Sequence, residues 1–500
     1  MLAHVPSATL LGVSGHAVRV EVHVSNGLPC FNVVGQPDSS CREARDRVRA
    51  AVLSSGYKWP DRRITVNLAP TGVRKVGSGL DLAIAMALLV ADGQLPANTL
   101  SGVGLLGELG LDGSVRPVPG VLPLCELVRA PTVVVPAASL AEARLARPEA
   151  VAVHRLAELA DALTGKGPWP DVDPRPPLAP PVTEPDLAEV QGQVVGRMAL
   201  EVAAAGGHHL LMVGPPGAGK TMLAERLPGL LPDLDDRDAM DVSRVHSAAA
   251  TLRAEHGLVR RPPFRAPHHT ASLVALVGGG TAQLRPGEVS LASGGVLFLD
   301  EMGEFPAAHL DALRQPLESG VIKVARAAAN VTLPARFLLV AATNPCPCGY
   351  DGWGDCRCTP AQVARYHRRL SGPLLDRFDI RLDVDPPDPA SVLLPGQGEA
   401  SAAVRARVAE ARARARARGV ACNRELRGAA LERHAPLDAG STARLRAMLE
   451  EGTLTMRGAQ RVRALALTLL DLDGGDGPLG VEHVEQALTL RCSARRGVLA

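Results

Sequence analysis

The chain has 500 residues, of which 46% are hydrophobic and 21% are charged, and its formal net charge is +2. This composition is ordinary for a globular protein with several cores, and so small a net charge gives no overall preference for nucleic acid or an anionic surface. No apolar run reaches the roughly 18 residues of a membrane helix, and the amino terminus lacks the pattern of a secretory signal, so we expect a cytoplasmic protein without membrane contact.

The first 165 residues predict an α+β domain. Valine alternates with polar residues over 18–24, which is typical of a strand with one buried face, and the mainly apolar residues 81–90 predict a helix. Eight of the nineteen residues 167–185 are proline. A stiff, extended linker is therefore expected over 166–185.

A glycine-rich loop at 214–221 reads Gly-Pro-Pro-Gly-Ala-Gly-Lys-Thr. It matches the pattern G-x-x-x-x-G-K-[ST] and stands between an apolar strand and a helix, as a phosphate-binding loop requires; a chance glycine-rich turn would not need those flanks. Backbone N–H groups would face the phosphates, Lys220 would reach the β- and γ-phosphates, and the Thr221 hydroxyl would ligate Mg²⁺. We expect ATP to contact Gly214, Pro215, Pro216, Gly217, Ala218, Gly219, Lys220 and Thr221.

Two later strands end in polar residues suited to the same site. The apolar run 295–299 ends in Asp300 and Glu301. After a phosphate loop, this pattern predicts that Asp300 holds Mg²⁺ and that Glu301 orients and deprotonates the attacking water. The run 337–343 ends at Asn344, which could position that water; the alternative is an asparagine that caps an Asn-Pro turn.

Four of the nine cysteines, Cys346, Cys348, Cys356 and Cys358, lie within thirteen residues. Such a cluster predicts a tetrahedral zinc site, with a glycine-rich loop between the two pairs. The C-x-C spacing is tighter than the usual C-x₂₋₄-C, so a disulfide pair and plain turn residues remain alternatives.

Residues from about 400 to the end predict helices. The segment 405–418 carries six arginines interleaved with alanine. Arginines two residues apart do not share a helix face, so a solvated helix and a DNA-contacting helix both fit the pattern.

Taken together, these motifs resemble those of the magnesium-chelatase-like AAA+ ATPases over 187–370. With the amino-terminal domain included, the chain is similar over nearly its whole length to the competence-associated ComM/YifB family. The resemblance rests on residues 214–221, 265–270, 285–292, 295–301, 344–349, 369–377 and 455–458.

The resemblance implies an α/β fold in three parts. A Lon-protease/ribosomal-S5-like (ChlI-type) α+β domain would occupy 1–165, a three-layer AAA+ P-loop core 186–385, and a helical lid 386–500. Proteolysis in the first domain is not expected, because the turn at Ser78 has no amine base and the position where a lysine would be needed holds Leu122.

Proteins of this kind form homo-oligomeric rings, usually hexamers, with ATP between subunits. Arg377 takes the place of an arginine finger and Arg457 that of the sensor-2 arginine. A guanidinium at either place would stabilise charge on the γ-phosphoryl group, and the alternative for each is a surface salt bridge.

The resemblance implies an ATP hydrolase that works as a DNA motor. We expect a helicase or branch-migration translocase in recombination or transformation, with DNA and recombination proteins as candidate partners. A β-hairpin predicted over 321–333 would place Lys323 and Arg326 against DNA phosphates. The alternative is a chelatase-like or protein-remodelling ATPase that acts on a protein partner.

Overall fold

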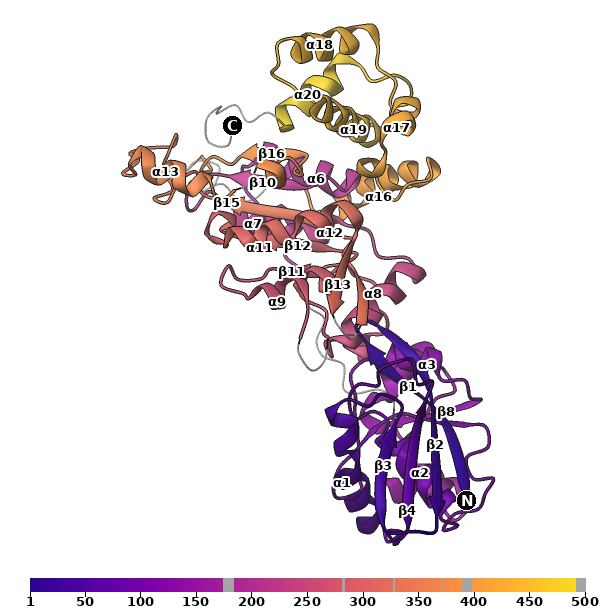
Figure 1. The fold of residues 1–500 in the computed structure, drawn as a ribbon. Helices are drawn as coiled ribbons and strands as arrows, with labels where there is room; N and C mark the ends of the chain where they lie inside the picture. The colour runs from indigo at the N-terminus through magenta and orange to yellow at the C-terminus, as the bar shows by residue number, and fades with distance from the viewer. Residues whose placement is uncertain (174–183, 281–283, 327–328, 371, 389–397, 492–500) are drawn as a thin grey trace.

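The structure is a computed structural model that describes residues 1–173, 184–280, 284–326, 329–370, 372–388 and 398–491. The molecule is elongated, with the amino-terminal region at one end, a parallel sheet in the middle and the carboxyl-terminal helices at the other end (Figure 1). The expected mixed α/β fold with a helical carboxyl-terminal part is confirmed.

The amino-terminal region has a four-stranded sheet in the order β1-β2-β4-β3 and a parallel three-stranded sheet in the order β5-β8-β9. The helix expected at 81–90 is buried at every one of its positions, because its apolar residues occupy all faces. The elements are β1 (Leu2–Leu11), β2 (Ser14–Ser25), β3 (Cys30–Val34), α1 (Ser39–Ser54), β4 (Arg63–Ala69), α2 (Asp81–Ala91), β5 (Val103–Leu105), β6 (Glu108–Leu109), β7 (Val115–Arg116), α3 (Val121–Leu127), β8 (Thr132–Pro136), α4 (Leu140–Ala146), β9 (Val151–Val153) and α5 (Leu156–Thr164).

The central sheet has five parallel strands in the order β11-β12-β15-β10-β16. Strands β10, β12 and β15 are buried at every residue, as expected for parallel strands covered on both faces. The strands are β10 (Leu210–Val213), β11 (Phe264–Arg265), β12 (Val296–Leu299), β15 (Leu338–Thr343) and β16 (Ile380–Asp383). The helices are α6 (Val194–Gly206), α7 (Lys220–Leu230), α8 (Asp236–Ala248), α9 (Leu273–Val277), α10 (Glu288–Leu291), α11 (Ala307–Ala312), α12 (Arg314–Ser319), α13 (Pro360–His367) and α14 (Gly372–Leu375).

This strand order decides where the functional residues meet. Parallel strands have their carboxyl ends at one edge of the sheet, and β15 lies between β10 and β12. The residues that follow these three strands, Gly214, Asp300 and Asn344, therefore gather at the same edge.

The hairpin expected over 321–333 is present, as β13 (Val321–Arg326) paired with β14 (Ala329–Pro334). One face of it packs on the turn between β1 and β2, where a Cβ at Gly12 would overlap the Val331 side chain. Lys323 is exposed, whereas its neighbour Ile322 is buried.

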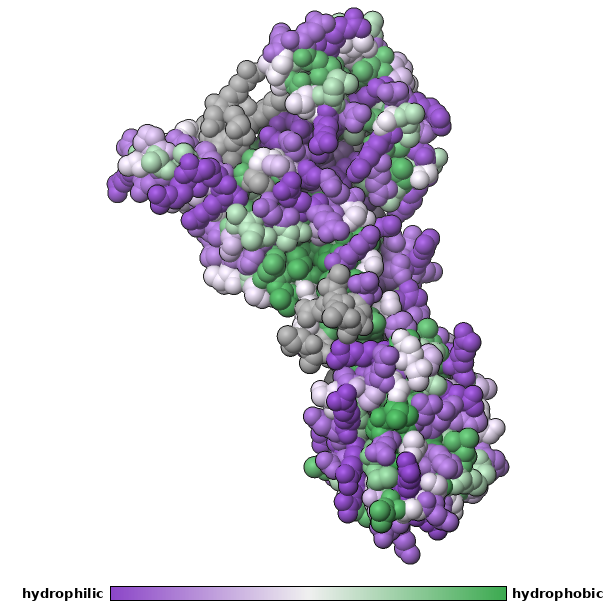
Figure 2. Space-filling view, in the orientation of Figure 1, coloured by the Kyte–Doolittle hydropathy of each residue, from purple (hydrophilic) through white to green (hydrophobic). Residues whose placement is uncertain are grey.

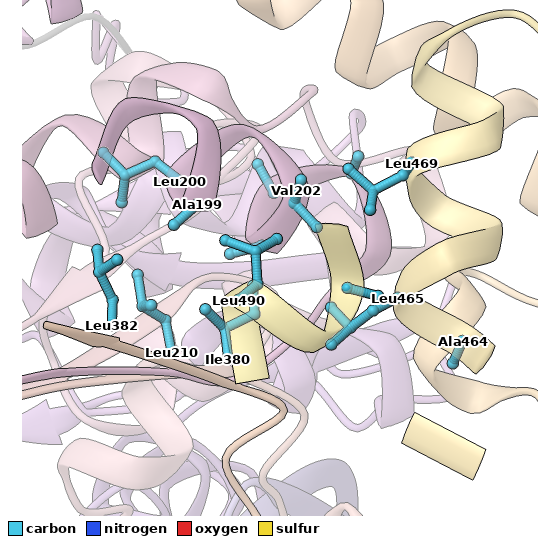
Figure 3. Close-up of a cluster of buried hydrophobic side chains, with 14 of the residues drawn as sticks. Ala199, Leu200, Val202, Leu210, Ile380, Leu382, Ala464, Leu465, Leu469 and Leu490 are labelled. Atoms are coloured by element: carbon cyan, nitrogen blue, oxygen red, sulfur yellow. The ribbon is translucent and has the colours of Figure 1, made fainter. Parts of the chain in front are cut away.

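The carboxyl-terminal helices share a hydrophobic core with the central sheet. Figure 3 shows side chains of α6, β10 and β16 packed against Leu465, Leu469 and Leu490. These helices are α16 (Ser401–Ala417), α17 (Gly428–His434), α18 (Ala439–Glu450), α19 (Met456–Leu472) and α20 (Val481–Arg491).

The arginine-rich segment forms α16 and its end, and the arginines bind this chain itself. Arg407 pairs with Glu201 at 2.6 Å, and Arg412 donates to the Ala204 carbonyl at 2.9 and 2.7 Å. Arg405, Arg414 and Arg418 also bond to carbonyl or carboxylate oxygens of neighbouring segments. Most of these arginines thus fasten the helix to the core and are still partly exposed, with 38% of the side chain exposed in Arg405 and Arg407, and Arg416 is exposed.

The face seen in Figure 2 is mostly hydrophilic, with green concentrated where Figure 1 places α9 and β13. On α9, Leu273 and Val274 are exposed. Within the described residues, none of the helices combines the length and the hydrophobicity that crossing a membrane would need.

Candidate nucleotide site

The loop at 214–221 joins β10 to α7 in a conformation that depends on glycine. Gly217 and Gly219 have φ angles of +77° and +88°, which side chains rarely adopt. At Gly214 a Cβ would overlap the Val384 carbonyl oxygen. The loop ends at Lys220, the first residue of α7, so the amino end of this helix faces the place where phosphate is expected.

Lys220 is buried, and its ammonium group is held by oxygens. It donates to the carbonyls of Gly214 and Pro215 at 2.7 and 2.9 Å and to the Asn344 side chain at 3.1 Å. Burial lowers the pKa of Lys220, and the charges of Asp300 and Glu301 oppose that effect. The structure thus brings Lys220 and Asn344 together, with Lys220 bonded to oxygens that phosphate oxygens could replace.

Thr221 and Asp300 form the oxygen cluster predicted to hold Mg²⁺. The Thr221 hydroxyl donates to Asp300 Oδ2 at 2.8 Å, and the Glu301 backbone N–H donates to Asp300 Oδ1 at 2.9 Å. Hydroxyl and carboxylate oxygens beside expected phosphates are the donors that Mg²⁺ prefers, so these residues fit that ion.

Glu301 lies next to a residue that the sequence analysis gave no role. Its carboxylate is 3.3 Å from His269 Nδ1, and the His269 ring lies against His268 with ring centroids 4.1 Å apart. Both histidines, Thr221, Asp300 and Glu301 line a cleft of about 280 Å³. The only signal in the sequence was the histidine pair in the insertion between the loop and Asp300.

Gln193 is a second residue that sequence reasoning missed. Its side-chain amide donates to the carbonyls of Ala218 at 3.0 Å and Asp385 at 2.7 Å. It thereby ties the phosphate loop to the end of β16. A single glutamine before a helix carries no recognisable pattern, which explains why it was overlooked.

Arg377 and Arg457 lie apart from the other predicted site residues. Arg377 binds the Glu318 carboxylate and donates to the Pro373 carbonyl at 2.7 Å. Burial, followed by the charges of Arg314 and Arg457, lowers the pKa of Arg377. Arg457 is exposed, near the start of α19. The two arginines therefore lie in one region, and neither bonds to the phosphate loop in the part of the chain described.

Asp379, two residues after Arg377, anchors the carboxyl-terminal helices. Arg424 and Arg461 contact its buried carboxylate at 2.8 and 3.2 Å, and His208 Nδ1 lies 3.6 Å away. Burial alone would raise the pKa of Asp379, but His208 and Arg424 together hold it well below its usual range.

The two residues predicted to contact DNA lie on β13. Lys323 is exposed and faces Thr332 across the hairpin. Arg326 is the last residue of this strand, and its side chain lies outside the described residues.

All four clustered cysteines come together. The Cys346 sulfur is 3.3 Å from that of Cys348 and 3.7 Å from that of Cys356, and all four sulfurs lie within 4.8 Å of one another. The backbone N–H groups of Arg357 and Tyr350 lower the pKa of the Cys348 thiol to about 6.

In the amino-terminal region, Ser78 has no amine partner among its hydrogen bonds. Its hydroxyl donates to Glu108, while the ammonium of the nearby buried Lys75 donates to the Pro70 carbonyl. Leu122 is buried, and its backbone N–H donates to Glu142.

Three sequence families of magnesium-chelatase proteins match this chain. Residues 186–392 match the family of the magnesium chelatase subunit ChlI, residues 20–139 match the family named subunit ChlI of Mg-chelatase, and residues 398–491 match the family of the ChlI carboxyl-terminal part. The Escherichia coli protein YifB is 42% identical over 500 residues, which cover 99% of this chain and 98% of YifB. The chain belongs to the ComM/YifB family of magnesium-chelatase-type AAA+ proteins.

Two further relatives extend this comparison. Competence protein ComM of Haemophilus influenzae is 40% identical over 509 residues, covering 99% of this chain and 98% of ComM. A probable DNA helicase of Arabidopsis thaliana, MCM9, is 29% identical over 177 residues, covering 35% of this chain and 22% of MCM9. For this ComM/YifB protein, membership in a magnesium-chelatase-type family indicates ATP and Mg²⁺ use.

Proposed function

We propose that the protein is a ring-forming, ATP-hydrolysing motor that acts on DNA in the cytoplasm, as a helicase or branch-migration translocase in recombination or transformation. The observation that carries the ATPase part is the meeting of Lys220, Thr221, Asp300 and Asn344 at one edge of the sheet. The DNA part is supported by the names of two relatives, a competence protein and a probable DNA helicase.

Each residue at this edge has a distinct task. Lys220 binds the β- and γ-phosphates, and Thr221 and Asp300 hold Mg²⁺, which neutralises phosphate charge when bound. Asn344 orients the attacking water, and Glu301 takes its proton. Glu301 is reachable for this task because its side chain is 56% exposed at the cleft.

We propose that a second copy of the chain completes the site. The described contacts of Arg377, with Glu318 and Pro373, are away from the phosphate loop, and Arg457 lies close enough for its charge to lower the pKa of Arg377. We propose that this pair reaches the nucleotide bound by a neighbouring subunit, in a homo-oligomeric ring that is most simply a hexamer. An arginine supplied in this way stabilises charge that develops on the γ-phosphoryl group.

We further propose that the amino-terminal region is a non-proteolytic binding or assembly domain. The described hydrogen bonds of Ser78 and Lys75 support this: Ser78 donates to Glu108 and the Lys75 ammonium donates to the Pro70 carbonyl, whereas a Lon-type serine would need a lysine amine as its base. Lys323 and Arg326 remain the proposed DNA contacts, and recombination proteins the proposed partners.

A panel of single-stranded, duplex and four-way DNA tests the proposal through binding and the ATPase rate. We expect DNA to bind in a salt-sensitive manner and to stimulate hydrolysis, because contacts to phosphates release counterions. Glu301→Gln should abolish hydrolysis but retain ATP binding, whereas Glu432→Gln, at an exposed position on α17, should change neither. ATP turnover without any DNA response would contradict the DNA assignment alone.

A second candidate follows from the family models, all three of which describe a magnesium-chelatase subunit. In that case the same ATPase would remodel a protein partner. Stimulation of hydrolysis by a purified protein client, combined with no response to DNA, would favour it.

A further inference from the structure

The cysteine cluster lies directly beside the nucleotide site. It begins two residues after Asn344, which directly follows β15, and ends two residues before α13. The described Sγ–Sγ distances include 3.3 Å between Cys346 and Cys348 and 3.6 Å between Cys348 and Cys356. No pair is a disulfide at such distances, since bonded sulfurs are about 2.05 Å apart.

The arrangement has the size of a one-metal site. Four sulfurs around Zn²⁺, each at about 2.3 Å, lie about 3.8 Å from one another in a tetrahedron. The four sulfurs here lie within 4.8 Å, which leaves room for one ion and not for an iron–sulfur cluster between them. We propose that Cys346, Cys348, Cys356 and Cys358 bind one Zn²⁺ ion.

Thiolates select zinc over magnesium, so this site differs chemically from the oxygen cluster at Thr221 and Asp300.

The segment that carries the cysteines braces the phosphate loop from outside. Gly349 packs on Pro216, where a Cβ would come within 2.5 Å of the proline Cδ. On the other side, Trp353 Nε1 donates to the Asp385 carboxylate at 2.6 Å, and the Asp385 carbonyl accepts from Gln193 at 2.7 Å. Gln193 in turn donates to the Ala218 carbonyl.

A metal at the four cysteines would therefore fix two parts of the nucleotide site. It would hold Asn344 through the two residues that follow it, and it would hold the loop through Gly349 and Trp353. The zinc is thus structural and positions the groups around the phosphates without touching them. This consequence rests on the proposed ATPase function, whereas binding of zinc does not.

Metal content of the purified full-length chain tests the site itself. We expect about one zinc per chain by elemental analysis, and about one in Cys30→Ser as the matched control. The double variant Cys356→Ser, Cys358→Ser should contain almost none. Because that variant could misfold, the wild-type protein is also stripped with a chelator and titrated with Co²⁺. The visible spectrum of tetrahedral thiolate-bound Co²⁺ is expected, and it should disappear when Zn²⁺ is added.

Less than a few tenths of a zinc per chain, together with no such Co²⁺ spectrum, would overturn the assignment. A brown protein that contains iron and sulfide would overturn the zinc assignment in favour of an iron–sulfur cluster.

Binding of a fluorescent ATP analogue then tests the bracing role, the proposed support of the phosphate loop by the metal. The stripped protein should bind the analogue at least about tenfold more weakly, and binding should recover on adding Zn²⁺. Unchanged binding would contradict the bracing role and leave the metal site in place, and failure of the ATPase proposal would not alter the metal content.

Discussion

At the scale of single residues, the contact between His269 and Glu301 is the least expected feature of the site. Glu301 has a φ angle of +49°, which is uncommon outside glycine, and its carboxylate lies beside His269 Nδ1. The residue proposed as the base is therefore held by a histidine from the insertion that contains α9. A water activated by Glu301 would share this carboxylate with His269.

Removing the His269 side chain should free the Glu301 carboxylate from its contact with that ring. We expect His269→Ala to raise ATP hydrolysis in the absence of DNA by about fivefold, since a partly exposed ion-pair contact is worth up to about 1 kcal/mol. His268→Ala is the matched control, because His268 bonds to Thr270 and not to Glu301. The steady-state rate measures the effect, and equal rates for both variants would show that the contact does not restrain Glu301.

Arg377 should act on the neighbouring subunit. Arg377→Ala is expected to lower hydrolysis about 10³-fold while ATP still binds, because an arginine finger acts on the transition state. Mixing this variant with Glu301→Gln subunits should restore part of the rate. In such mixed assemblies, a site with intact Glu301 can lie next to a subunit with intact Arg377.

Two controls make the mixing experiment decisive. Each variant assayed alone, Arg377→Ala or Glu301→Gln, should remain inactive at the same total protein concentration. If the mixture of the two is no more active than either alone, the arginine works within its own chain. That result would contradict the shared site and not the phosphate loop.

Among the secondary-structure elements, β16 is preceded by a buried carboxylate, Asp379, that binds the carboxyl-terminal part of the chain. Asp379 precedes β16 and is bound by Arg424 and by Arg461 of α19. We expect Asp379→Asn to lower the free energy of unfolding of this region by about 3 kcal/mol, because two arginines would lose their partner. The exposed Asp376, changed to Asn, is the control.

The contribution of Asp379 to the free energy of unfolding should decrease as the pH is lowered. Its pKa is lower in the folded protein than the unfolded value of about 3.9, so its stabilisation is complete above that value and is lost as the pH falls below it. Urea denaturation at pH 7, 5 and 4 should therefore show a constant gap between wild type and Asp379→Asn down to pH 5. The gap should begin to narrow toward pH 4, and a gap that widens would be inconsistent with a lowered pKa.

The elements also show what the sequence could predict. The loop at 214–221, Asp300 and Asn344 were predicted because each is a local pattern at the end of an apolar strand, and parallel strands bring such ends together. The partners of Arg407 and Arg412 in α16 were not predictable, because they lie on α6, about two hundred residues away in sequence. The pairing of Glu301 with His269 was missed because it too joins residues that are not neighbours in the sequence.

For the whole molecule, the central question is how the amino-terminal region is joined to the nucleotide core. Arg244 of α8 pairs with both oxygens of Glu126 on α3, at 2.7 and 2.9 Å, and the Gly120 N–H donates to the Ser247 carbonyl at 3.0 Å. The hairpin β13–β14 also packs on the turn at Gly12. One continuous apolar core runs through this contact, so the region is docked to the core as well as linked by the chain.

Reversing a charge at this contact should loosen the docking. Arg244→Glu would place two carboxylates side by side, and Glu126→Arg would place two guanidinium groups together, while the double variant restores an opposite pair. Since both side chains are about one-third exposed, we expect a coupling of about 1 kcal/mol.

Small-angle scattering and limited proteolysis within 166–185 would report the change. Each single variant should be more extended and cleaved faster, and the double variant should resemble the wild type. If neither single variant differs from the wild type, the apolar core alone holds the two regions together.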